Sequence, residues 1–247
     1  MPLVIAHRGS SAHAPENTLA AFRRAIDDGA DAVELDIHLT KDGEVVVIHD
    51  AQLQRTTDGR GLVWHHTVKE LQRLSAGSWF HRTFTAERIP TLDEVFTLLG
   101  GTIGINIEIK ADSSRRQDFT IVHHCCEIVK KHQAERMVII SSFSESFIKR
   151  VKIIQPSIAT ALLYHPVRHL GRSPIEFTQR SNAEYLILNG SRIRKRLIRK
   201  AHERNILIGE YTVNTQWRVR RALRYGVDVL FTNDPSWLRK ALSKAQK

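Results

Sequence analysis

Short apolar segments rich in β-branched residues alternate with segments of helical periodicity along the 247-residue chain, and this alternation limits the possible folds more than any other feature. It is typical of βα units, in which successive strands run parallel and a helix crosses over between them. Eight strands are predicted, at residues 3–6, 32–39, 104–110, 137–141, 159–164, 185–189, 206–213 and 229–232. Eight repeats favour an α/β fold of the closed (β/α)₈ TIM barrel type, and a doubly wound open sheet is the alternative.

The chain length is that of one barrel, since such a domain commonly needs about 250 residues. We therefore expect residues 1–247 to form a single barrel domain. The segment between the second and third strands departs from the repeat. A turn at residues 41–44 leads into a short extra strand at 45–48, and the following residues up to Pro90 are rich in Thr, Gly, Trp and His. We interpret residues 41–90 as a small insertion over one rim of the barrel, where long loops often bind ligands.

Composition and charge narrow the possible partners and location. No segment approaches the ~18 consecutive apolar residues of a spanning helix, and the N-terminus lacks the features of a signal peptide. We therefore expect no stable membrane insertion and a cytoplasmic location. Lys and Arg number 37 against 26 Asp and Glu, an excess of 37 − 26 = 11 that favours anionic partners. No nucleic-acid-binding motif accompanies the charge, so nucleic acid is not an expected partner. The oligomeric state is not predicted.

Cys125 and Cys126 are the only cysteines, and they are adjacent in a segment with helical periodicity. A disulfide between neighbouring residues would be strained, and neither cysteine has a metal-ligand partner at a useful spacing. Both are therefore predicted to be free thiols.

Two predicted strands each carry one polar face, because side chains in a strand alternate between its two faces. The polar residues are Glu34, Asp36 and His38 in the second strand, and Asn106, Glu108 and Lys110 in the third. In a barrel the aliphatic faces pack on the helices and the three carboxylates point inward, where an unpaired charge is costly to bury. A bound cation resolves that cost, and ligands of oxygen alone favour Mg²⁺, Ca²⁺ or Mn²⁺. The alternative is a pair of half-exposed antiparallel strands whose charges meet water.

His7 and Arg8 stand at the end of the first predicted strand, the position at which barrel enzymes place catalytic side chains. Arg8 can bind phosphate oxygens through two nitrogens. His49 closes the extra strand. Histidine suits proton transfer near neutral pH, so two histidines can act as the base and the acid that cleavage of a phosphodiester needs.

The residues before the first helix have different predicted roles. Asn17 and Thr18 are interpreted as capping residues at a helix start. Glu16 is an acidic residue near the rim, where it can orient a ligand or a neighbouring basic group.

Nine segments carry a family resemblance when they are taken together and in order. They are AHRGSSAHAPENTLAAF, VELDIHLTKDGEVVVIHD, LQRTTDGRG, AGSWF, IPTLDEV, INIEIK, SSFS, YTVN and GVDVLFTNDP. Across nearly the whole chain they resemble the glycerophosphodiester phosphodiesterase family. The resemblance implies a barrel enzyme that hydrolyses small glycerophosphodiesters to sn-glycerol 3-phosphate and an alcohol.

The resemblance also implies roles for particular residues. The metal ligands would be Glu34, Asp36 and Glu108, the acid/base pair His7 and His49, and the phosphate contacts Arg8 and Lys110. Two departures affect the walls of the pocket more than the chemistry. Tyr211 stands where many relatives have tryptophan, and Asn233 follows Thr232 where relatives often have an acidic residue. These departures bear on substrate preference.

An alternative function is that of a phospholipase D- or C-like enzyme that acts on lysolipids at a membrane surface. Such an enzyme would need an exposed apolar patch. The candidates in the insertion are Leu62, Val63, Trp64, Trp79 and Phe80, which we expect to pack against the barrel rim. The densest basic run, residues 192–200, is expected to lie on an outer helix with its cations toward solvent.

Overall fold

The computed structural model describes residues 1–110, 119–167, 169 and 171–245. Within these residues eight parallel strands pair in the order β1-β9-β8-β7-β6-β5-β4-β2, and β1 also pairs with β2. The strands are β1 (Leu3–His7), β2 (Ala32–Leu39), β4 (Gly104–Ile109), β5 (Val138–Ser142), β6 (Ala159–Tyr164), β7 (Tyr185–Asn189), β8 (Leu207–Tyr211) and β9 (Val229–Thr232). The pairing of β1 with both β9 and β2 closes the sheet, which confirms the predicted TIM barrel and excludes the open sheet.

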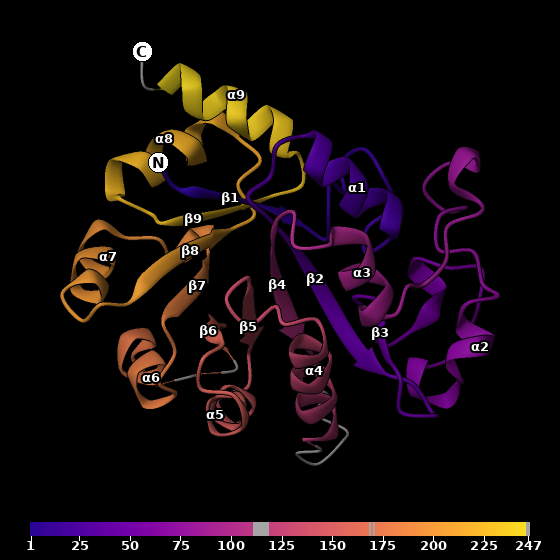
Figure 1. Ribbon diagram of the computed structural model, residues 1–247. Coiled ribbons are helices and arrows are strands. Elements are labelled where there is room, and N and C mark those ends of the chain that lie inside the picture. Colours follow the sequence, from indigo (N-terminus) through magenta and orange to yellow (C-terminus); the bar gives the residue numbers. More distant parts are fainter. Residues whose placement is uncertain (111–118, 168, 170, 246–247) are drawn as a thin grey trace.

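The crossover helices surround the barrel (Figure 1). They are α1 (Leu19–Asp27), α3 (Leu92–Leu99), α4 (Thr120–Lys131), α5 (Glu145–Ile154), α6 (Pro174–Arg180), α7 (Lys195–His202), α8 (Gln216–Tyr225) and α9 (Pro235–Ala245). Local chemistry sets their ends. Thr91 and Glu94 form a capping box at the start of α3, and Gly100 ends that helix with a φ of 51°, a left-handed conformation that glycine adopts at little cost.

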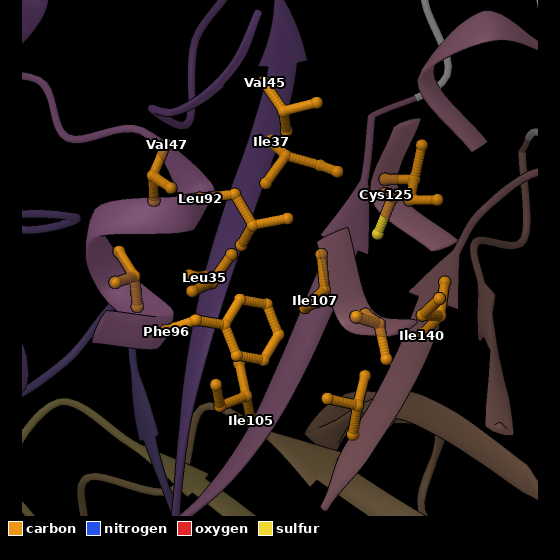
Figure 2. Packing of buried hydrophobic residues seen from close by; sticks show 14 of the residues in the cluster. Leu35, Ile37, Val45, Val47, Leu92, Phe96, Ile105, Ile107, Cys125 and Ile140 are labelled. Carbon is orange, nitrogen blue, oxygen red and sulfur yellow. The ribbon is translucent and has the colours of Figure 1, made fainter. Parts of the chain in front are cut away.

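The aliphatic faces of β2 and β4 pack outward on α3 and α4 (Figure 2). Leu35 and Ile107 are fully buried there, and each such side chain contributes about 1.5–3 kcal/mol through burial. This packing turns the alternate side chains of both strands toward the barrel interior. The register places Asp36 opposite Glu108 and Glu34 opposite Asn106. The outward core therefore fixes which carboxylates meet inside the barrel.

The insertion follows β2 and builds a small unit at one side of the barrel. It begins with β3 (Val45–Val47), which pairs antiparallel with β2, and continues through η1 (Leu53–Arg55), η2 (Val63–His65), α2 (Val68–Leu71) and η3 (Arg82–Phe84). A separate apolar cluster, which includes Val46, Leu53, Val63 and Leu71, holds these short elements together. The predicted extra strand is confirmed.

The apolar patch that a lipid enzyme would need is not gathered in the insertion. Val63 is buried, while Leu62, Trp64 and Phe80 are half-buried, so Trp79 is the exposed member of the five candidates. None of the helices within the described residues has the length and apolar character to cross a membrane.

The basic run lies on α7 from Lys195 onward, and its first three residues precede that helix. Ile193, Ile198 and Ala201 are buried, and the Arg and Lys side chains between them are exposed. The cations of this helix therefore lie on the outer surface of the barrel, away from its interior.

Candidate active site

A pocket opens among the carboxyl ends of the barrel strands and has a volume of about 470 Å³, including its open mouth. Its lining has a polar side, His7, Arg8, Glu34, His49, Asn106, Glu108 and Lys110, and an apolar side, Phe143, Leu163, Ile187, Tyr211 and Phe231. The polar side follows β1 to β4 and the apolar side follows β5 to β9. Six of the seven residues that the sequence singled out thus line one pocket. The seventh, Asp36, is 1% exposed and contacts two of the six.

Three carboxylates converge at the polar side. Oxygens of Glu34, Asp36 and Glu108 lie within 4.8 Å of one another. Burial, together with the charges of the other two carboxylates, holds the pKa of Glu34 well above its usual value, and burial also raises the pKa of Glu108. Burial opposes ionisation of Asp36 as well, but the charges of Lys110, His49 and Arg8 and the hydrogen bond from Lys110 together outweigh it and lower the pKa of Asp36.

Two basic groups partly balance these carboxylates. The Nζ of Lys110 lies 2.7 Å from an Asp36 oxygen and 2.6 Å from a Glu108 oxygen. The backbone N–H of Arg8 donates to Glu34 at 2.9 Å, and its side-chain Nε lies 3.5 Å from Asp36. With every group ionised, three negative and two positive charges leave −3 + 2 = −1. In that state the cluster carries one negative charge, which a bound cation would offset.

The donor set suits a hard divalent cation. Besides the carboxylate oxygens, the side-chain oxygen of Asn106 is buried in the pocket wall and has no hydrogen-bond partner among the described residues. The other end of that amide donates to Ser141 at 3.1 Å, which fixes the oxygen's direction. Buried polar atoms are normally paired, so an orphaned oxygen beside a carboxylate cluster is consistent with a cation ligand.

A second group of possible ligands, His13, Asp28 and Asp234, lies outside this pocket. Its members already have partners. Asp28 accepts from Ser10 at 2.5 Å and from Arg24 at 2.9 Å, and His13 lies 3.1 Å from Asp234. These contacts explain the group as part of the loop structure without a bound ion.

His7 presents one nitrogen to the pocket. Its Nδ1 lies 2.9 Å from the side-chain oxygen of Asn233, an acceptor, so Nδ1 carries the proton and Nε2 is free to accept one. The expectation that the departure at Asn233 affects the pocket wall more than the chemistry is therefore wrong, because Asn233 contacts His7 and does not line the pocket. Nε2 lies 4.0 Å from Glu34. Burial and the nearby Arg8 guanidinium lower the pKa of His7 to about 4, so its imidazole is neutral at neutral pH.

His49 is oriented by two contacts. Its Nδ1 donates to the Asp50 carboxylate at 2.6 Å, and its backbone carbonyl accepts from His38 at 3.1 Å. Burial lowers the pKa of His49. Because Asp50 accepts from Nδ1, the Nε2 atom of His49 is left for proton transfer, in the manner of carboxylate-oriented histidines in hydrolases.

Arg55 links the surroundings of Arg8 to those of His49. The sequence patterns assigned Arg55 no role. Its Nη atoms donate to Glu16 at 2.9 and 2.7 Å, and its Nε donates to Asp50. Glu16 in turn accepts from Arg8 at 2.9 Å, which confirms that it orients a basic neighbour. Arg55 therefore acts on Arg8 through Glu16 and on His49 through Asp50. The segment LQRTTDGRG that contains it was the available signal.

The interpretation of Asn17 as a capping residue alone is wrong. Thr18 is the N-cap of α1 and accepts from the backbone of Ala21, as predicted. Asn17 instead donates to the Asp36 carboxylate at 2.8 Å and accepts from the Asp36 backbone N–H at 3.3 Å. A left-handed backbone conformation, with a φ of 59°, turns its amide toward β2. Spacing along the chain gives no sign of this conformation.

Comparisons with known proteins agree with this architecture. A model of the glycerophosphoryl diester phosphodiesterase family matches residues 7–236. A glycerophosphodiester phosphodiesterase of Caldanaerobacter subterraneus is 39% identical over 98% of both chains, and one of Bacillus altitudinis is 35% identical over 95% of this chain and 96% of the relative. A phosphodiesterase of Oleispira antarctica, solved in complex with the product sn-glycerol-3-phosphate, superposes with a TM-score of 0.91 at 29% identity and covers 98% of this chain and 97% of its own.

A closed (β/α)₈ barrel with this pocket at the carboxyl ends of its strands, taken with these relatives, defines an enzyme of the phosphoric diester hydrolase class. The family match extends over nearly the whole length of the barrel. The chain belongs to the glycerophosphoryl diester phosphodiesterase family.

Proposed function

We propose that this chain is a single catalytic domain that uses a divalent cation and two histidines to hydrolyse glycerophosphodiesters to sn-glycerol 3-phosphate and an alcohol. The observation that carries the proposal is the meeting of three carboxylates, two histidines and two basic side chains in one pocket. The product found in the Oleispira antarctica relative supports the same substrate class.

Glu34, Asp36 and Glu108 are proposed as the cation ligands, with the orphaned oxygen of Asn106 beside them. Their oxygen ligands suit Mg²⁺, Ca²⁺ or Mn²⁺. A cation held by these residues would supply Lewis-acid neutralisation of the phosphate charge. Asn17 donates a hydrogen bond to Asp36 at 2.8 Å, so this ligand would be oriented before a cation binds.

His7 and His49 are proposed as the acid/base pair. Asn233 and Asp50 hold the Nδ1 protons, so each histidine uses Nε2. One histidine is neutral, and its Nε2 accepts the proton of the attacking hydroxyl. The other enters the reaction as the imidazolium, protonated on both nitrogens, and its Nε2 donates a proton to the departing alcohol oxygen. The attacking group is water or the glycerol 2-hydroxyl, and both routes begin with these two proton transfers. Attack by the 2-hydroxyl gives a cyclic phosphate, which water then opens to sn-glycerol 3-phosphate in a second step.

Arg8 and Lys110 are proposed to contact the phosphate. Both line the pocket beside the carboxylates, and each is already positioned by an ion pair with Asp36. Their charges offset the negative charge of the diester, while a guanidinium can bind two phosphate oxygens at once. The residues that would hold the phosphate and those that would hold the cation lie on the same polar side of the pocket.

The test is the release of sn-glycerol 3-phosphate from glycerophosphocholine by the wild type and by the His7→Ala and His49→Ala variants. Each variant should lose at least ~10²-fold in turnover, the usual contribution of a positioned proton-transfer group, with a smaller change in substrate affinity. Arg196→Gln on α7 is the matched control and should retain the wild-type rate. A near-wild-type rate in either histidine variant would remove that residue from the mechanism, and an inactive wild type would refute the proposed activity.

A further inference from the structure

A second, larger pocket lies beside the candidate active site, where β5 leads into α5 and faces α6. It has a volume of about 710 Å³ and opens broadly to solvent. Phe143, the residue that links β5 to α5, lines both this pocket and the candidate active site. The carbonyl of Phe143 accepts a hydrogen bond from His169 at 3.0 Å, which holds this shared wall. The two pockets therefore adjoin at Phe143.

The second pocket is cationic. Lys149, Arg172 and Arg180 surround one carboxylate, Glu145, with N···O distances of 2.7, 3.5 and 3.7 Å respectively. The sum of their formal charges is +3 − 1 = +2. The side chains of the three cations are 45%, 52% and 65% exposed, whereas Glu145 is 14% exposed. A single carboxylate cannot neutralise three cations, so the pocket attracts another anion.

Hydroxyl groups at the start of α5 add polar contacts to the same pocket. Ser144 and Ser146 both line it, and their hydroxyl oxygens lie 2.8 Å apart. The guanidinium of Arg172 lies 5.0 Å from the ring centre of Phe177, which limits its freedom and directs it along the pocket wall. Cations, hydroxyls and a helix start of this kind are the groups that bind phosphate and carboxylate in proteins.

We propose that this second pocket binds a negatively charged group on the alcohol part of the substrate, so that the enzyme favours glycerophosphodiesters whose alcohol carries an additional phosphate or carboxylate. The inference rests on the proposed function, because it assumes that the diester itself is cleaved in the first pocket. Phe143, which lines both pockets, would lie between the scissile phosphate and the second anionic group.

The experiment compares two substrates that differ by a single phosphate, glycerophosphoinositol and glycerophosphoinositol 4-phosphate, and measures kcat/KM from the release of sn-glycerol 3-phosphate. The wild type should favour the phosphorylated substrate by about 10-fold or more, as expected for charge-assisted hydrogen bonds. The double variant Lys149→Gln/Arg172→Gln should lose most of that preference. Its kcat/KM on glycerophosphoinositol should stay within about twofold, which also shows that the variant is folded.

The matched control is Arg196→Gln/Lys200→Gln, which removes the same charge from the exposed face of α7 and should leave the preference unchanged. Equal rates of the wild type on both substrates, or a double variant that keeps the preference, would overturn the inference and leave the proposed function intact. Failure to cleave either inositol substrate while glycerophosphocholine is cleaved would overturn the inference alone, whereas failure on all three substrates would overturn the proposed function and with it the inference. Sedimentation with phosphatidylglycerol vesicles distinguishes a lipid ligand. Vesicle binding that the double variant loses, without a change in substrate preference, would assign the pocket to a membrane surface and overturn the inference.

Discussion

Replacing Asn17 by glycine tests how the cation ligands are held before a cation binds. Asn17 is 4% exposed, and its φ of 59° is one that glycine adopts without strain. The change therefore leaves the backbone conformation in place and removes two hydrogen bonds to Asp36, at 2.8 and 3.3 Å. A hydrogen bond to a charged group contributes about 1.5–3 kcal/mol, and the longer bond adds less. We expect Asn17→Gly to lower the free energy of unfolding by about 2–3 kcal/mol.

The assay is thermal unfolding followed by circular dichroism. For a chain of this size each kcal/mol shifts Tm by about 2–4 °C, so the expected fall for Asn17→Gly is about 4–12 °C. The free energy of unfolding of Asn17→Ala should be lower than that of Asn17→Gly by about 1 kcal/mol, because a left-handed backbone conformation is unfavourable for alanine. A Tm of Asn17→Gly equal to that of the wild type would refute the idea that Asn17 holds Asp36, whatever the alanine variant shows.

Two further predictions follow from contacts around the site and in α4. The variant Arg55→Lys cannot reproduce both the paired contact with Glu16 and the contact with Asp50. We expect kcat to fall about 10-fold or more with little change in KM, and the pH profile of kcat to shift, because Asp50 no longer orients His49. An unchanged kcat and pH profile would show that Arg55 is only structural. Burial raises the pKa of Cys125 well above its usual value and that of Cys126 to about 11. Neither thiol should therefore react with iodoacetamide at neutral pH until the chain is unfolded. Rapid labelling of the native protein would contradict the burial of the two thiols.

The sequence predicted the barrel well because the barrel depends on repeated local patterns. Four of the eight predicted strands match the observed bounds, those at 32–39, 159–164, 185–189 and 229–232, and the others differ by one or two residues at their ends. Strand alternation also predicted which carboxylates turn inward, since the aliphatic faces could only pack on helices. These are properties that a strand carries in its own side chains.

The supporting contacts of the site could not be predicted in this way. Asn17 reaches Asp36 only because of a left-handed backbone, and Asn233 reaches His7 only because the barrel closes the first strand against the last. Arg55 lies in an insertion whose path over the rim depends on its own small apolar cluster. Each of these contacts joins segments that are distant in the sequence or depends on a single dihedral angle. The periodicity of apolar residues along the chain indicates neither property.

The cation at the three carboxylates is the central claim, and activity after removal of metal tests it most directly. The measurement is the rate of sn-glycerol 3-phosphate release from glycerophosphocholine after exhaustive chelation and again after addition of Mg²⁺, Ca²⁺ or Mn²⁺, in the wild type and in Glu34→Gln. We predict that the chelated wild type is inactive, that at least one of these cations restores its rate, and that none restores Glu34→Gln to that rate. Full activity in the chelated wild type, with no response to any added cation, would contradict the claim.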